Sequence, residues 1–105
     1  MINEYIRYRI TADRTTEFLD AYGEASKSLQ ASRHCLGYEL SRCSEAPEFF
    51  ILRIHWDSAD GHIKGFRTEP EFRPFFKAVQ PFIASIEEMR HYELTPIRWA
   101  REAKP

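Results

Sequence analysis

The stretch GYELSRCSEAPEFFILRIHWDSADGHIKGFRT, residues 37–68, decides the fold. Apolar and polar side chains alternate over residues 38–42, which is typical of a strand with one covered face. Residues 44–48 have the composition of a turn, including a proline that would interrupt an interior strand. Residues 49–56 alternate again and are rich in side chains that favour strands. The stretch therefore predicts a β-hairpin with an aromatic second strand that ends at a tryptophan.

A broken helical region is expected after the hairpin. Asp57 and Ser58 offer side-chain oxygens that cap a helix start, and this first segment is expected to run to about Phe66. Thr68-Glu69-Pro70 interrupts it, because proline suits the first turn of a new helix. The apolar residues within 72–86 then recur with helical spacing. Prolines 74 and 81 predict kinks or a second break inside that run.

The flanking sequence supplies one more helix and two more strands. Residues 4–10 alternate as a strand, and residues 14–31 carry a single apolar stripe with helical spacing, with Asp13 as the expected N-cap. Residues 87–94 form the last strand. The predicted order β-α-β-β-α-β is the ferredoxin-like plan, an α+β fold in which helices cover one face of a four-stranded antiparallel sheet.

The two faces of that sheet differ in composition. The face expected under the helices carries Ile6, Tyr8, Ile10, Tyr38, Leu40, Phe50, Leu52, Ile54, Trp56, Tyr92 and Leu94. The opposite face carries Arg7, Arg9, Glu39, Ser41, Arg53, His55, His91 and Glu93, together with Tyr5, Ile51 and Met89. A solvated face explains this mixture, since antiparallel sheets permit one. A homodimer of two stacked sheets explains it as well, because it would cover the apolar residues and pair Arg with Glu.

Chain length and net charge limit the classes of protein to which this chain can belong. A chain of 105 residues is expected to form one domain, here residues 1–95, followed by a charged tail over residues 96–105. Ile97 and Trp99 in the tail are expected to pack on the domain or on a partner subunit. A formal net charge of −1 argues against nucleic acid or an anionic membrane as partner, because both favour basic surfaces. No apolar run approaches the length of a membrane span.

The two cysteines indicate a reducing compartment. Cys35 and Cys43 flank the first strand of the hairpin, which separates them by about 26 Å at roughly 3.3 Å per residue. A disulfide needs Cα atoms within about 7 Å of each other, so these two cannot pair. Their spacing also lacks the pattern of a zinc site. Because the N-terminal sequence has no signal-peptide pattern, we expect a cytoplasmic protein with free thiols.

Histidines and tyrosines are the candidates for chemistry. The four histidines are His34, His55, His62 and His91, and their spacing predicts neither a metal site nor a cofactor. His62 stands out because it shares a helical face with Phe66 and would point towards the aromatic sheet; a partly buried structural histidine is the alternative. Tyr8 and Tyr38 place hydroxyls in an apolar face, where they could orient a phenol or serve as core residues. No catalytic triad, phosphate loop or dinucleotide motif is present.

Four motifs together resemble the antibiotic biosynthesis monooxygenase (ABM) superfamily. They are Cys35-Leu36-Gly37-Tyr38-Glu39-Leu40, Phe50-Ile51-Leu52, Trp56-Asp57-Ser58 and Thr68-Glu69-Pro70-Glu71-Phe72. Their order and spacing agree with the family over roughly residues 3–95. The resemblance implies a ferredoxin-like protomer that pairs into a dimeric α/β barrel, with a pocket between sheet and helices in each protomer.

The resemblance also implies an activity. Members of the superfamily oxidise quinol-like or polyphenolic substrates with O2 and without metal or flavin. An electron-rich phenolate can reduce O2 if the protein deprotonates, orients and dehydrates it. The chain departs from the family at Ile54, where Glu is usual, and at Gly65, where His is frequent. A haem-degrading branch uses an Asn-Trp-His set, and Ile6, Gly65 and about Phe76 occupy those positions here, so that mechanism is not expected.

We therefore expect a cofactor-independent monooxygenase, a homodimer that binds a small aromatic substrate and O2. The expected catalytic residues are His62, as the base that replaces the missing helical histidine, and Tyr38. The residues expected to bind substrate are Tyr8, Trp56, Phe66 and Phe76. A non-catalytic dimer that holds an aromatic metabolite is one alternative. A haem-related protein that uses His62 or His34, or acts beside a haem partner, is another, and a purely structural or regulatory dimer is the last.

Overall fold

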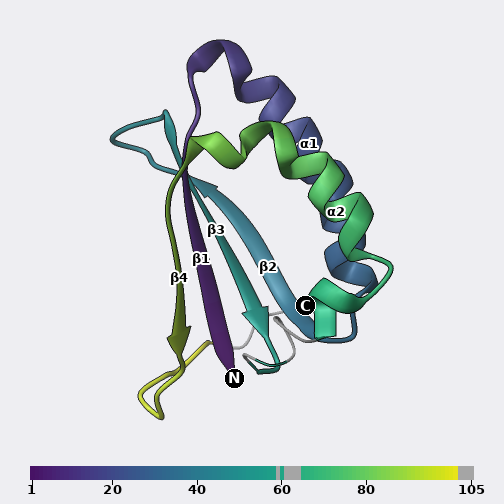
Figure 1. Ribbon diagram of the computed structural model, residues 1–105. Helices are drawn as coiled ribbons and strands as arrows, with labels where there is room; N and C mark the ends of the chain where they lie inside the picture. Colours follow the sequence, from purple (N-terminus) through teal and green to yellow (C-terminus); the bar gives the residue numbers. More distant parts are fainter. Residues whose placement is uncertain (59, 61–64, 102–105) are drawn as a thin grey trace.

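The computed structural model describes residues 1–58, 60 and 65–101 of the chain (Figure 1). Its strands are β1 (Ile2–Arg9), β2 (Cys35–Arg42), β3 (Phe49–Trp56) and β4 (Ile86–Glu93). Its α-helices are α1 (Thr15–Ala31) and α2 (Phe72–Val79). The 3-10 segments between them are η1 (Ala12–Arg14), η3 (Phe66–Thr68) and η4 (Gln80–Ser85).

The strands form one antiparallel sheet in the order β2-β3-β1-β4. β1 is central and pairs with β3 on one side and β4 on the other, whereas β2 and β4 are the edges. Both α-helices lie against the same face of the sheet (Figure 1). The structure therefore confirms the predicted ferredoxin-like α+β fold.

Aromatic contacts hold α1 on the sheet. The predicted apolar stripe of this helix is buried, with Phe18, Tyr22, Ala25 and Leu29 in the core. The Phe18 ring lies 4.9 to 5.2 Å, between centroids, from the rings of Tyr8, Phe50 and Phe82. Pairs of this kind contribute roughly 0.5–1.5 kcal/mol each beyond the area that they bury. The expected N-cap was wrong, because Asp13 lies inside η1 and α1 begins at Thr15 without a side-chain cap.

The helical region after β3 is broken where proline predicts a break. η3 ends at Thr68, and α2 begins at Phe72 after a turn that contains Pro70. The α-helical path ends at η4, which has Pro81 in its first turn. Pro74 lies in the first turn of α2, where its missing N–H is not needed, so the helix continues through it. Most of the helix predicted from Ser58, including His62, lies outside the described residues.

A β-bulge changes the phase of β4. In its pairing with β1, Tyr8 lies opposite Ile86 and Arg7 lies opposite Glu88, so Glu87 is an extra residue. The side-chain direction alternates along a strand, and one extra residue therefore reverses the face of everything that follows it.

This bulge overturns the predicted orientation of β4. Simple alternation placed Tyr92 under the helices, and Met89 and His91 on the open face. In the structure Met89 and His91 lie opposite Ile6 and Glu4 on the helix-covered face. The Tyr92 ring instead meets the Tyr5 ring on the open face, with centroids 5.4 Å apart. The sequence pattern could not show this, because charged residues occur on both faces of β4.

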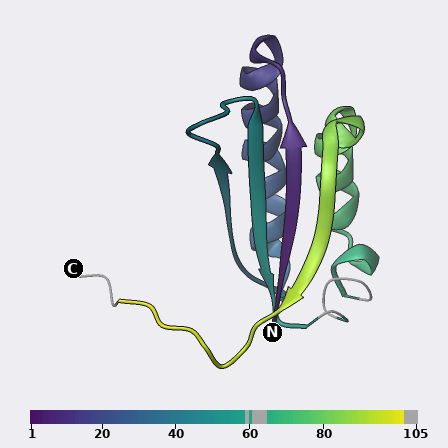
Figure 2. The same cartoon turned by 90° about the vertical axis from the view of Figure 1, so that its left-hand side faces the viewer.

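The tail leaves β4 and extends away from the sheet (Figure 2). Ile97 and Trp99 keep 93% and 75% of their surface exposed. The Arg101 guanidinium lies over the Trp99 ring, 4.8 Å from its centroid. Packing of these side chains on their own domain, one of the two expected arrangements, is therefore not observed.

Two further findings concern the whole described chain. Cys35 and Cys43 are free thiols, as predicted. Within residues 1–58, 60 and 65–101, no helix is long and apolar enough to cross a membrane.

Gly23 in the middle of α1 gives a test of helix energetics. A Cβ atom added there would meet nothing within 4 Å. Gly23→Ala should raise the free energy of unfolding by about 1 kcal/mol, because alanine loses less backbone entropy in a helix than glycine does. Denaturant unfolding followed by circular dichroism measures the change. Gly65→Ala is the matched control and should destabilise the protein, because its Cβ would overlap the His34 ring. An unchanged or lower stability for Gly23→Ala would contradict the prediction.

Candidate functional site

A cavity of about 290 Å³ lies between the helix-covered face of the sheet and the segment from η3 to η4. The strands contribute Glu4, Ile6, Tyr8, Ile54, Trp56, Ile86 and Met89 to its lining. The helices and 3-10 segments contribute Tyr22, Phe66, Arg67, Phe72, Phe75, Phe76, Val79 and Ile83. The lining is mostly aromatic and aliphatic with few polar groups, as is usual for small-molecule pockets.

The structure brings four of the predicted site residues together at this cavity. Tyr8, Trp56, Phe66 and Phe76 all line it. Tyr38 does not; its hydroxyl, on edge strand β2, accepts a hydrogen bond from Gln30 Nε2 at 2.6 Å. His62 lies outside the described residues. The expected binding residues thus form one group, and the catalytic roles of Tyr38 and His62 stay predictions.

Glu4 is a cavity residue that sequence analysis missed. Its side chain lies on the helix-covered face of β1, and the residue is only 2% exposed. Trp56 Nε1 donates a hydrogen bond to Glu4 Oε1 at 3.1 Å. His91 Nε2 lies 3.5 Å from Glu4 Oε2. The two partners come from β3 and β4, the strands on either side of β1, so the strand order itself assembles this polar group.

Opposing effects set the proton affinity of Glu4. Burial raises the pKa of its carboxyl above that of an exposed glutamate. The Trp56 hydrogen bond and the nearby charges of His91 and Arg67 act to lower the pKa, because they favour the carboxylate. A carboxylate whose proton affinity has been increased by burial is suited to act as a general base.

Two tyrosine hydroxyls form a second polar group at the cavity. The hydroxyls of Tyr8 and Tyr22 share a hydrogen bond between β1 and α1. Burial raises the pKa of Tyr8 to about 12, and burial also raises the pKa of Tyr22. Both hydroxyls therefore keep their protons near neutral pH, and this pair can hydrogen-bond to an oxygen of a ligand.

Tilted and edge-on rings form the apolar wall. The Phe66 ring lies 5.3 Å from both the Trp56 and the Phe75 rings, measured between centroids. Phe76 remains 41% exposed although it lines the cavity, and Arg67 is exposed as well. Ile83 and Met89, which also line the cavity, are 41% and 45% exposed, so the cavity reaches solvent along its lining from η3, α2, η4 and β4.

His34 has a structural partner away from the cavity. Its Nδ1 lies 2.9 Å from Asp57 Oδ2, and this contact lowers the pKa of the Asp57 carboxyl. Glycine at position 65 leaves room for the His34 ring. His34 does not line the cavity. In the described part of the chain, no three His, Cys, Asp or Glu side chains gather as metal ligands would.

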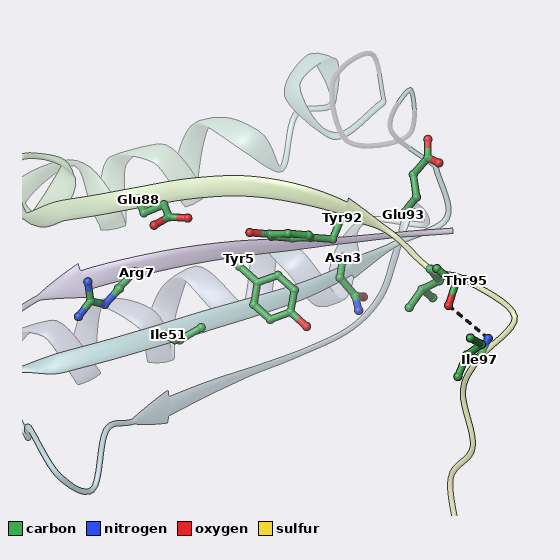
Figure 3. Close-up of a pocket in the computed structure, with 10 residues that line it drawn as sticks. Asn3, Tyr5, Arg7, Ile51, Glu88, Tyr92, Glu93, Thr95 and Ile97 are labelled. Carbon is green, nitrogen blue, oxygen red and sulfur yellow. Dashed lines mark hydrogen bonds between the residues drawn. The ribbon is translucent and has the colours of Figure 1, made fainter.

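A larger hollow of about 570 Å³ lies on the open face of the sheet (Figure 3). Tyr5 and Tyr92 lie close together there, with Arg7, Ile51 and Glu88 further along the strands. Its acidic residues are exposed, in contrast to Glu4. We therefore take the helix-side cavity, with its buried carboxyl, as the candidate active site and the open-face hollow as a candidate contact surface.

Comparisons with known proteins agree with this architecture. The family model described as antibiotic biosynthesis monooxygenase matches residues 1–78. The "Uncharacterized protein YczJ" of Bacillus subtilis (strain 168) is 23% identical over 93 residues, which are 89% of this chain and 98% of that protein.

Two crystal structures show the same fold. One, called "Putative antibiotic biosynthesis monooxygenase" from Bordetella bronchiseptica, superposes with a TM-score of 0.76 at 26% identity, over 90% of this chain and 96% of its own. Another of that description, from Deinococcus radiodurans, has a TM-score of 0.72 at 15% identity, over 97% and 100% of the two chains. With its family match and its ferredoxin-like sheet, the chain belongs to the antibiotic biosynthesis monooxygenase family.

Proposed function

We propose that the protein is a cofactor-independent monooxygenase that oxidises a small phenol or quinol with O2. The observation that carries this proposal is the aromatic cavity between sheet and helices, which combines hydroxyl groups with one buried carboxyl. Membership of the family and the printed name of the Bordetella bronchiseptica protein support the class of reaction. The aromatic lining of the cavity supports a phenol or quinol as the class of substrate.

The reaction balances without a separate reductant. A phenol and O2 give a quinone and water: one oxygen atom enters the ring, the other leaves in water, and the substrate supplies four electrons. An electron-rich phenolate can pass its first electron directly to O2. The protein then has to bind, deprotonate and orient the substrate and keep water out.

The cavity has the size and chemistry for such a substrate. Its volume of about 290 Å³ suits a molecule of one or two rings, because pockets for larger ligands reach about 1,000 Å³. A flat ring would lie against Trp56 and Phe66, and the Tyr8 and Tyr22 hydroxyls would bind a ring oxygen. The free cysteines also fit the reducing cytoplasm as the site of action.

Oxygen consumption is the direct test of the proposal. Purified protein, stripped of metals with a chelator, should consume O2 above the autoxidation rate when supplied with quinols of one or two rings. An oxygen electrode measures the rate, and mass spectrometry with labelled O2 should find one labelled atom in the product. Binding of these compounds without O2 uptake would contradict the proposal and favour the non-catalytic holder of an aromatic metabolite.

Filling the cavity should block turnover without unfolding the protein. Ile83 lines the cavity and is 41% exposed, so Ile83→Trp can be accommodated while its indole ring enters the substrate space. We expect kcat/KM to fall about tenfold or more. Leu19→Trp, at a site on α1 that is 46% exposed and does not line the cavity, is the matched control. Equal losses in the two variants would place the substrate elsewhere.

We also propose that two copies pair through the open face of the sheet. Tyr92 and Ile51 are 50% and 42% exposed on this face, beside Arg7 and Glu88. A two-fold interface places the same surface on both copies, so it can bring Arg of one copy to Glu of the other. In such a dimer the exposed Trp99 of the tail would pack on the partner subunit, since it does not pack on its own domain.

A charge placed at the centre of this face should separate the copies. Ile51 lies opposite Arg7 in the β1–β3 register, so Ile51→Arg adds a second cation beside an existing one. Size-exclusion chromatography with light scattering should give a dimeric mass for the natural protein and a monomeric mass for this variant. Leu19→Arg, on the other side of the molecule, should stay dimeric. A monomeric natural protein would contradict the proposed pairing.

A further inference from the structure

We propose that Glu4 is the general base of the reaction and takes the proton of the substrate hydroxyl, with Trp56 and His91 as its positioning residues. This inference deepens the proposed function and rests on it. It assigns the base to β1, not to the helical histidine that sequence analysis favoured.

The position of Glu4 is the first argument. Of the described residues that line the cavity, Glu4 alone has a carboxyl group. Trp56 Nε1 donates to its Oε1 at 3.1 Å, and His91 lies on the side of Oε2. The side chain is thereby fixed from both neighbouring strands, as a catalytic group has to be.

The other polar groups of the described lining are poor proton acceptors. The Tyr8 and Tyr22 hydroxyls hold their own protons, because burial raises both pKa values. Arg67 is a permanent cation and has no lone pair to offer. The Trp56 N–H is a donor only. Glu4 is therefore the lining group that can receive a proton near neutral pH.

The proposed step is balanced. A proton passes from the substrate O–H to Glu4, so the O–H bond breaks and a carboxylic O–H bond forms. The phenolate that results gives an electron to O2, and the superoxide and the phenoxyl radical combine at a ring carbon. Glu4 returns its proton to the peroxide, so that a hydroperoxide forms at the ring carbon. The C–H bond of that carbon and the O–O bond then break, a C=O bond forms, and the ring hydrogen leaves as a proton with the hydroxide as water. Net charge is conserved in the first transfer, since the negative charge moves from the carboxylate to the phenolate.

The Tyr8 hydroxyl on β1 and the Tyr22 hydroxyl on α1 lie within electrostatic reach of Glu4, and both keep their protons near neutral pH. Within the described residues, the groups that favour the carboxylate form of Glu4, which can act as a base, are the Trp56 N–H on β3, His91 on β4 and Arg67 on η3. The sign of the expected pH effect follows. Activity should fall as the pH drops through the pKa of Glu4, and removal of any of these groups should raise that pKa and move the loss of activity to higher pH.

The kinetic test compares Glu4→Gln with Glu17→Gln, a control at an exposed glutamate of α1. The amide keeps the shape and the hydrogen bond from Trp56 but cannot accept the proton. We expect kcat to fall about 10²- to 10⁴-fold in Glu4→Gln, with circular dichroism unchanged and with no effect in the control. Turnover within about twofold of the natural protein would overturn the proposal.

The positioning roles have a separate readout, which simple destabilisation would not affect. The acid limb of the pH–kcat profile should move to higher pH in Trp56→Phe, and by a smaller step in His91→Gln, since the Trp56 hydrogen bond acts more strongly on Glu4 than the His91 charge does. If the acid limbs of the two variants' pH–kcat profiles coincide with the acid limb of the natural protein, these two roles are overturned.

Binding of 4-nitrophenol tests Glu4 independently of turnover. In the natural protein the probe hydroxyl would share its proton with Glu4, so the absorbance of the bound probe should titrate about one pH unit or more above its value in Glu4→Gln. Equal midpoints would overturn the role of Glu4 even if O2 uptake is found. A shifted midpoint without O2 uptake would support the proton contact while contradicting the proposed function. A natural protein that neither binds the probe nor consumes O2 would contradict both.

Discussion

The hydrogen bond from Trp56 to Glu4 is the interaction that allows a carboxyl group to lie buried between the sheet and the helices. A carboxyl group that is 2% exposed has lost almost all of its contact with water. Such burial costs several kcal/mol unless donors or cations replace the water. The sheet order provides the replacement, because β1 lies between β3 and β4 and receives one partner from each. Burial of Glu4 lowers the stability of the folded protein, and the same burial raises the affinity of the carboxylate for a proton. The feature that destabilises the fold is therefore also the one that suits Glu4 to act as a base.

The sequence carries enough information for the fold, since its local patterns and its tertiary structure agree. The alternation in residues 38–42 and 49–56 predicts the hairpin of β2 and β3, and the apolar stripe of α1 is the buried one. Proline places the breaks around α2 because its effect is local and does not depend on tertiary contacts. β4 is different. Its orientation depends on a bulge formed against another strand, and no pattern within residues 87–94 contains that information.

The candidate site also has residues that could be predicted from the sequence and one that could not. Tyr8, Trp56, Phe66 and Phe76 could be predicted because apolar side chains on one face of a sheet or helix converge on one core. Glu4 could not be predicted with equal ease, since its partners are 52 and 87 positions away and an acidic residue next to a strand start usually faces water. One signal was available: Glu4 is in phase with Ile6 and Tyr8. It also lies directly across from Ile54, where the family resemblance leads one to expect Glu, so Glu4 supplies a carboxyl to the same cavity wall from the neighbouring strand.

The bulge at Glu87 has a consequence for how this family can vary. The start of β4 is tied to η4, whose Phe82 is buried in the core, and its end has to bring His91 to Glu4. Both ends are fixed in space, and side chains alternate between the two faces along a strand. The number of residues between the two ends therefore decides which face His91 lies on, and the extra residue Glu87 places it on the face of Glu4. Relatives whose η4–β4 connection is shorter or longer by one residue should have a regular β4 without the bulge. In an alignment, a single-residue gap at this point would then mark the loss of the bulge, with the later residues of β4 still on the same faces. The residue equivalent to His91 would have to be identified by its pairing with β1 and not by its distance from Pro81.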